Sequence, residues 1–271
     1  MPIGNPYNER SLTSAQGFIY YIKGVLSQRG VIIPEIPPTI LIAYSDPLIE
    51  RAKSSYHFLP VNIGTRKPTE IFFFRPIQGP EFAMVSPQYG DAMAVTTLEE
   101  LIALGFQNFL SLGTAGHPTD KNVPQLSVGD AISVNDALSY EGTSRHYSPA
   151  GTIAKADKSI NEVLRRLLAE RDIRFHEGRV ATTSGIYRET PSFVRKVLSK
   201  GAIALDMETS ALLTVAEYHK KPMGTLLYVS DVIKVREGTS NGWEVDFLSG
   251  SVAETEQKVF EVAMKLVNRL Q

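Results

Sequence analysis

Two carboxylates, Asp206 and Glu208, flank Met207 in the stretch ALDMETSALL, where an apolar run of strand type leads into an apolar run of helix type. Glu208 is expected in the first turn of that helix, where a carboxylate gains from the helix dipole without any ligand. A binding role is the alternative, because an ionised carboxylate only accepts hydrogen bonds and can receive both donors of a vicinal diol, such as the 2′ and 3′ hydroxyls of a ribose. Met207 would then place a soft apolar surface against the sugar. The spacing by itself leaves both interpretations open.

A third acid, Asp231, ends the apolar run LLYVSD. An acid withdrawn from water at the end of a buried strand has a raised pKa and can serve as a proton donor. The structural alternative is that Ser230 or Asp231 caps a following helix. Acid catalysis and capping therefore both remain possible for this position.

Two further segments carry polar or flexible residues next to expected strands. Gly113, Thr114 and Gly116 in LGTAGHP could offer backbone N–H groups and a hydroxyl to an anion, although a tight turn explains the pattern equally well. His146 in EGTSRHYSP could bind a hydroxyl or lie at the surface. The other histidines show no metal-ligand spacing, and no G-x-S-x-G motif is present, so neither a metalloenzyme nor a serine hydrolase is indicated.

The bulk composition excludes several classes of protein. A chain of 271 residues is near the upper end of what one hydrophobic core organises, so one large domain is expected. The formal net charge of −1, without blocks of like charge, gives no attraction for polyanions, so nucleic-acid polymers and membranes are not expected partners. The absence of cysteine excludes disulfides, thiolate metal sites and cysteine nucleophiles. The polar opening residues lack a signal-peptide pattern, which favours a cytoplasmic protein.

Strand-type and helix-type runs alternate from Thr39 onward. Such alternation predicts an α/β fold around a mostly parallel sheet, in which ligands gather beyond the carboxyl ends of the strands. Residues 1–38 are expected to form an N-terminal extension with a short helix and a proline-rich linker, and residues 39–271 the α/β domain. The expected strands are 39–44, 70–77, 81–87, 108–113, 130–138, 178–185, 202–205 and 223–231, and the expected helices are 46–59, 91–105, 158–172, 191–201, 207–221 and 251–270.

Three motifs together resemble one family. LDMETSALLTVAEY resembles the V-E-M-E-A ribose motif of the nucleoside phosphorylase and nucleosidase superfamily, and LEELIALGFQNFLSLGTAG resembles its E-E-L segment and second glycine loop. LSVGDAISVNDALSYEGTSRHYSP resembles the V-G-D strand and loop of uridine phosphorylase-like members. The resemblance runs from about Thr39 to the C-terminus. The superfamily also includes hexameric purine nucleoside phosphorylase-like members. It implies a single α/β domain with a central mixed, partly barrel-like sheet flanked by helices, assembled as a homo-oligomer (dimer, trimer or hexamer) whose sites borrow residues across subunits.

The resemblance also implies roles for individual positions. Asp231 matches the acid that purine-cleaving members use opposite the base, so the expected substrates are a purine ribonucleoside and phosphate. The implied activity is that of a pentosyltransferase in nucleotide salvage, with phosphate as co-substrate and without a cofactor or metal. The implied site residues are Met207, Glu208 and His146 for the ribose, Ser184, Ile186, Tyr187 and Arg188 for the base, Asp231 for catalysis, and Ser45, Arg51, Gly113 and Thr114 for phosphate.

The phosphate end departs from the family pattern. Ser45 replaces a glycine of the first loop, while Ile49 and Ser111 stand where phosphorolytic members carry arginines. Arg51 is the nearest substitute in the sequence, and Arg66 or Arg75 of a neighbouring subunit are others. Phosphorolysis with a rebuilt anion site is therefore expected first, hydrolysis by water second, and a nucleoside-binding relative without turnover third.

Overall fold

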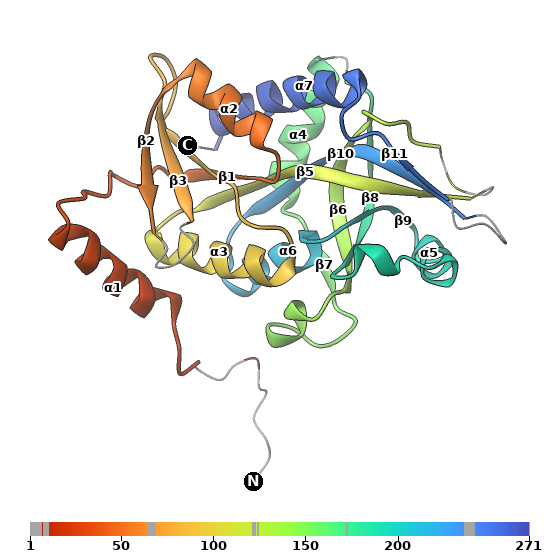
Figure 1. Ribbon diagram of the computed structural model, residues 1–271, viewed down its shortest axis with the longest axis horizontal. Coiled ribbons are helices and arrows are strands. Elements are labelled where there is room, and N and C mark those ends of the chain that lie inside the picture. Colours follow the sequence, from red (N-terminus) through yellow and green to blue (C-terminus); the bar gives the residue numbers. More distant parts are fainter. Residues whose placement is uncertain are drawn as a thin grey trace, which may run out of the picture.

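A mixed sheet with helices on both faces organises the chain (Figure 1). The computed structural model describes residues 7, 11–63, 69–120, 123, 125–171, 173–235 and 242–270. The strands are β1 (Thr39–Ala43), β2 (His57–Asn62), β3 (Glu70–Arg75), β4 (Phe82–Val85), β5 (Asn108–Thr119), β6 (Ala131–Tyr140), β7 (Ile153–Lys155), β8 (Phe175–Thr183), β9 (Ala202–Asp206), β10 (Met223–Lys234) and β11 (Trp243–Val245). The helices are α1 (Ala15–Gln28), α2 (Asp46–Ser55), α3 (Asp91–Leu104), α4 (Lys158–Glu170), α5 (Pro191–Leu198), α6 (Thr209–Tyr218) and α7 (Gly250–Val267), with short 3-10 helices η2 (Thr143–His146) and η3 (Ile186–Arg188).

The strand pairings close a ring at the centre of the sheet. β5 pairs with both β9 and β10, β10 pairs with β6, and β8 joins β6 to β9. β1 continues the sheet from β5 through β4 and β3 to the edge strand β2. Among the described residues five strand pairs are parallel and six are antiparallel. The expectation of a mixed sheet flanked by helices is confirmed, whereas the expectation of a mostly parallel sheet is wrong.

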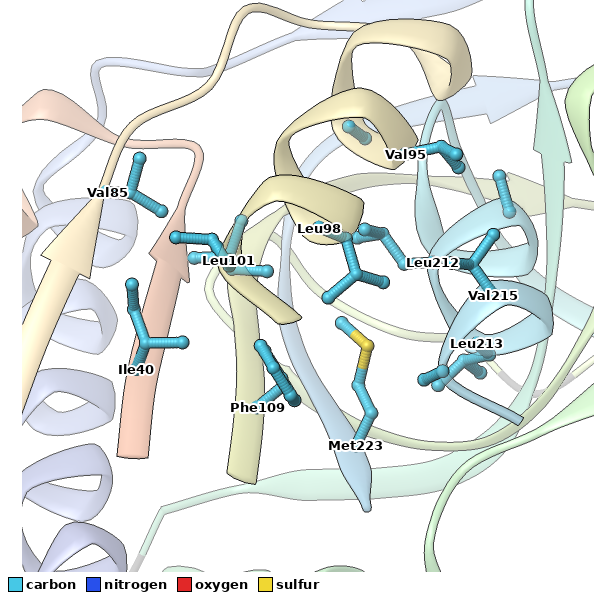
Figure 2. Close-up of a cluster of buried hydrophobic side chains, with 14 of the residues drawn as sticks. Ile40, Val85, Val95, Leu98, Leu101, Phe109, Leu212, Leu213, Val215 and Met223 are labelled. Carbon is cyan, nitrogen blue, oxygen red and sulfur yellow. The ribbon is translucent and has the colours of Figure 1, made fainter. Parts of the chain in front are cut away.

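Two hydrophobic cores lie on opposite faces of this sheet. α1, α3 and α6 pack over one face, and α2, α4 and α7 cover the other (Figure 1). Figure 2 shows the first core, in which Leu98 of α3 faces Leu212 of α6 above Met223, while Leu101 points toward Val85 and Ile40 of the strands. Each such buried side chain contributes roughly 1.5–3 kcal/mol relative to exposure. This packing holds the beginnings of α3 and α6 against the ends of the strands.

α1, which precedes the proline-rich segment, packs against the domain. Ile19, Ile22 and Leu26 of α1 are buried in the same core as α3. The helical spacing in this region therefore marks a helix that packs on the body of the protein. None of the helices in the described part of the chain combines the length and apolar character that crossing a bilayer requires.

Five strands differ from expectation. β5 does not end at Gly113 but continues to Thr119, because β10 pairs with it as far as Lys234. The expected glycine loop is thus part of a strand, and Asp231 lies within β10 rather than at its end, which excludes the capping role.

α2 ends at Ser55, and the residues after it form β2, which pairs with β3. β7 and β11, each three residues long, were not expected because runs of this length carry no periodicity.

Candidate active site

A cavity of about 790 Å³ opens where β1 and β9 end and beside the middle of β5 and β10. Its size suits a small organic ligand. Its wall combines apolar rings, small residues of β5 and several acids. The residues that line it are Tyr44, Ser45, Asp46, Pro47, Tyr89, Ser111, Gly113, Thr114, Ala115, Gly116, Ile186, Tyr187, Glu189, Leu205, Asp206, Met207, Glu208, Leu227, Tyr228, Ser230, Asp231, Ile233, Phe247, Leu248, Ser249, Val252, Ala253 and Glu256.

Glu208 lies at the N-cap position of α6, but its side chain makes no capping hydrogen bond. Its Oε1 instead accepts a hydrogen bond of 2.6 Å from the backbone N–H of Gly90, just before α3. The residue is 8% exposed, and no lysine or arginine of the described chain pairs with it. Burial, and then the charge of Asp206, raise the pKa of Glu208 to about 8. This carboxyl group is therefore buried in a cavity wall without a cationic partner, as a diol-binding group requires.

Asp206, rather than Glu208, has a structural role at the start of α6. Its Oδ2 accepts the backbone N–H of Thr209 at 2.8 Å, and its Oδ1 accepts the hydroxyl of Thr182 at 2.6 Å. The Thr182 hydroxyl in turn accepts the N–H of Ser210 at 2.8 Å. Burial raises the pKa of Asp206, while the hydrogen bonds from Thr182 and Thr209 oppose that shift. One acid of the pair thus fixes the start of α6, and the other remains available to the cavity.

Asp231 lies on β10, where both oxygens of its carboxylate accept hydrogen bonds. Its Oδ1 accepts the Ser230 hydroxyl at 2.8 Å, and its Oδ2 accepts the indole N–H of Trp243, on β11, at 2.6 Å. Asp231 pairs with Gly116 of β5, and a Cβ built at Gly116 would come within 2.9 Å of Oδ2. The side chain therefore lies over a position that only glycine leaves open. Trp243 also contacts the ring of Tyr187 edge-on, with centroids 6.5 Å apart.

A carboxylate of α7 contacts the loop that follows β1. Glu256 of α7 accepts hydrogen bonds from the hydroxyls of Ser45 and Tyr228, the latter at 2.7 Å. Burial, followed by this contact with Glu256, raises the pKa of Tyr228. The hydroxyl of Ser45, which the resemblance assigns to phosphate, thus donates to a protein carboxylate instead. Among the described residues that line the cavity, the ionisable side chains other than tyrosine are all acids: Asp46, Glu189, Asp206, Glu208, Asp231 and Glu256.

The structure gathers eight of the predicted site residues in the cavity wall: Ser45, Gly113, Thr114, Ile186, Tyr187, Met207, Glu208 and Asp231. It does not bring the other four there. Arg51 lies on the exposed side of α2, since Leu48, Ile49 and Ala52 form its buried side. His146 ends η2 at the surface, Arg188 ends η3 at the surface, and Ser184 donates to Oδ1 of Asp91 at 2.8 Å.

The two other arginines considered for binding phosphate do not supply a cation to the described wall of the cavity. Arg75 pairs with Glu81 at 3.0 Å on the surface, and Arg66 lies outside the described residues. A phosphate group in this cavity would therefore depend on cations that the described wall does not supply.

Sequence reasoning missed several residues of the wall. Tyr44 and Tyr228 were given no role, although both lie near the ends of the strands predicted from the sequence, where ligands were expected, and Glu256 lies on the last helix, for which no role was expected. Glu189 was given no role, although it lies in the same segment as Ile186 and Tyr187. Trp243 does not line the cavity, but it donates to Asp231 from β11, a strand that was not expected. The presence of a single tryptophan was a signal that could have drawn attention to position 243. No pattern could have shown that it donates to Asp231.

The fold and the cavity define an α/β protein with a cavity of a size that suits a small organic ligand. A family model described as the phosphorylase superfamily matches residues 39–268, and the chain belongs to that superfamily. The family that the sequence motifs resemble is thus confirmed by the family model.

Individual relatives are distant. A DeoD-type purine nucleoside phosphorylase of Brevibacillus brevis is 27% identical over 155 residues, which cover 55% of this chain and 62% of that protein. A uridine phosphorylase of Thermococcus kodakarensis is 26% identical over 155 residues, covering 52% and 54%. The matched segments span less than two thirds of these relatives. The crystal structure of purine nucleoside phosphorylase from Toxoplasma gondii in complex with immucillin-H has a TM-score of 0.74 at 19% identity, covering 87% of this chain and 92% of that one, which shows a shared fold.

Proposed function

We propose that this protein is a nucleoside phosphorylase that cleaves the N-glycosidic bond of a purine ribonucleoside, giving the free base and ribose 1-phosphate. The observation that carries the proposal is the presence of Glu208 and Asp231 in the wall of one cavity. Glu208 is buried without a cationic partner in the described chain, and Asp231 is fixed by two donors. Names of the relatives, which include both purine and uridine phosphorylases, support the class of reaction.

The chemistry requires a group at each end of the nucleoside. Breaking the C1′–N bond builds positive charge on the ribosyl ring and leaves the bonding electron pair on the base. Glu208 would hold the 2′ and 3′ hydroxyls so that the acceptor meets C1′ in line. A carboxyl group at the Asp231 end would protonate the departing base, a form of catalysis that typically contributes about 10²- to 10⁴-fold.

The proposal also names phosphate as the group that accepts the ribosyl unit. The hydroxyls of Ser45 and Thr114 and the small residues of β5 border the side of the cavity that the resemblance assigns to phosphate. Because Glu256 brings negative charge there, cations from outside the described wall would have to balance the phosphate. A neighbouring copy of the chain is the proposed source.

Hydrolysis is a second candidate, and the acidic lining of the cavity favours it. Water carries no charge and needs none of the cations that the described wall lacks. With water as acceptor, the products would be free base and ribose. The contacts of Glu208 and Asp231 would serve either acceptor.

One assay tests these alternatives. The protein is incubated with inosine, adenosine, uridine and methylthioadenosine, each with and without phosphate, and free base is measured. Phosphate-dependent release from the purine nucleosides is the expected result. Release that does not depend on phosphate would replace phosphorolysis with hydrolysis, and release from uridine alone would overturn the purine assignment. Thermal stabilisation by a nucleoside without any release of base would indicate a binding protein.

A further inference from the structure

Glu189 is an acid of the cavity wall that has no role in the reaction described so far. It follows η3 directly and lines the cavity together with Asp231. Its side chain is half-buried, and no hydrogen bond or ion pair joins it to another side chain in the described part of the molecule. A carboxyl group in this position is free to exchange a proton with a ligand.

Asp231 differs from Glu189 in its hydrogen bonds. Each of its oxygens already accepts a donor, Oδ1 from Ser230 and Oδ2 from Trp243. The indole nitrogen of Trp243 only donates, so Oδ2 cannot carry a proton toward it while this contact holds. With both oxygens accepting donors, Asp231 is arranged as a hydrogen-bond acceptor, whereas no side chain of the described residues donates to the carboxyl group of Glu189.

Electrostatics point the same way. Burial, and then the negative charge of Asp231, raise the pKa of Glu189 to about 7. Near neutral pH, Glu189 thus carries a proton during a substantial part of the time. Nearby elements of the described chain carry further charged groups. These are Arg188, exposed in η3, Arg195 and Lys196 of α5, Lys234 and Glu244, which pair across β10 and β11, and the cavity acids Asp46, Asp206, Glu208 and Glu256.

We propose that Glu189 supplies the proton to the departing base, while Asp231 beside it accepts an N–H of the base and orients it. This inference rests on the proposed cleavage of a nucleoside. As the C1′–N bond breaks, its electron pair stays on the base, and the proton of the Glu189 carboxyl group moves to a ring nitrogen. Glu189 is left as a carboxylate, and the acceptor, dihydrogen phosphate or water, returns a proton through the solvent. The step consumes no oxidant, reductant or further reactant.

The single tryptophan provides a readout that does not depend on turnover. Trp243 donates to Asp231 at 2.6 Å, so a change of charge at the neighbouring Glu189 should alter its fluorescence. The wild-type protein without ligand should show a transition centred near pH 7, as the pKa of Glu189 is about 7. Glu189→Gln should abolish this transition. Glu244→Gln, which changes the same residue type on β11, should retain it, and an unchanged midpoint in Glu189→Gln would overturn the inference.

Kinetics test the catalytic part. Wild-type kcat should fall as pH rises above about 7, because the carboxyl group that donates the proton becomes ionised. Glu189→Gln should lower kcat on a purine nucleoside by at least about tenfold at pH 6 with KM little changed, and should remove this alkaline limb. Glu189→Asp should restore part of the rate. Equal kcat and an unchanged pH profile in Glu189→Gln would refute the role.

The two measurements separate this inference from the function on which it rests. If the wild-type protein releases no base with or without phosphate, the proposed function and the proton transfer both fail, while the fluorescence still shows whether Glu189 holds the proton. If base is released and Glu189→Gln behaves as wild type, the function stands and the assignment of the proton to Glu189 falls.

Discussion

The backbone N–H of Gly90 donates to Oε1 of Glu208 at 2.6 Å, joining two positions that lie 118 residues apart in the chain. Gly90 has φ of 101°, in the region that favours glycine, and it immediately precedes α3. The carboxyl group that is proposed to bind the sugar is therefore oriented by a different helix from the one that follows it. The core between α3 and α6, shown in Figure 2, keeps these two positions together.

Replacing Glu208 by glutamine should weaken ribose binding selectively. A hydrogen bond to a charged group contributes about 1.5–3 kcal/mol, which corresponds to about tenfold to hundredfold in kcat/KM. The loss should be smaller for a 2′-deoxynucleoside, which lacks one of the two donors. Steady-state kinetics with the ribo- and deoxynucleoside of the same base measure this difference, and equal losses on both substrates would contradict the diol contact.

Nucleoside binding should strengthen as pH rises from 6 to 8. Burial and the charge of Asp206 raise the pKa of Glu208 to about 8, so the group is largely protonated at pH 6. The carboxylate is the form that accepts both hydroxyls, so binding must release a proton below pH 8 and should become independent of this group above it. Calorimetry in two buffers of different ionisation enthalpy counts the released protons. Binding to Glu208→Gln should lose this component, and identical proton release in that variant would exclude Glu208 as the source.

Gly116→Ala should displace Asp231, and Gly113→Ala should be far milder. The added Cβ at Gly116 would lie 2.9 Å from Oδ2 of Asp231 and 3.0 Å from Cδ1 of Ile233. At Gly113 the nearest atom, Cβ of Tyr44, is 3.4 Å away, which is close to ordinary contact. Overpacking of this kind costs about 1–3 kcal/mol. Thermal unfolding should show a lower Tm for Gly116→Ala than for Gly113→Ala, and equal values would contradict the geometry at Asp231.

Glu256→Gln should improve the use of phosphate if phosphate is the acceptor. The substitution removes a negative charge beside Ser45 but keeps an oxygen that can accept its hydroxyl. Removing a like charge at about 4 Å is worth about 1 kcal/mol in water and about 4 kcal/mol near a protein surface, so the KM for phosphate should fall about fivefold or more.

Glu254→Gln is the matched control for this experiment. Glu254 lies on the same helix, pairs with Lys258 at 2.7 Å and is exposed, so its replacement should leave the KM for phosphate as it is in the wild type. A KM that does not respond to Glu256→Gln would show that this carboxylate does not face the acceptor.

The sequence by itself determined the family, the alternation of strands and helices, and several residues of the cavity wall. These features are local: an apolar run, a turn and an acid at fixed spacing lie within one element and its neighbour. Met207, Glu208 and Asp231 could be placed near a site in this way because each follows or lies within a buried strand.

Only the tertiary structure decided how the acids divide their roles and which further groups join them. Asp206 caps α6 because Thr182, on the parallel strand β8, reaches it, and Glu208 is released from capping because Gly90 is brought near by α3. Glu256 meets Ser45 across 211 positions. Such contacts depend on how distant elements pack, and the charge of a cavity is the sum over all of them. No local sequence pattern reveals the total charge of a cavity. The sequence could therefore indicate a phosphate site, although acids line the described wall of the folded cavity.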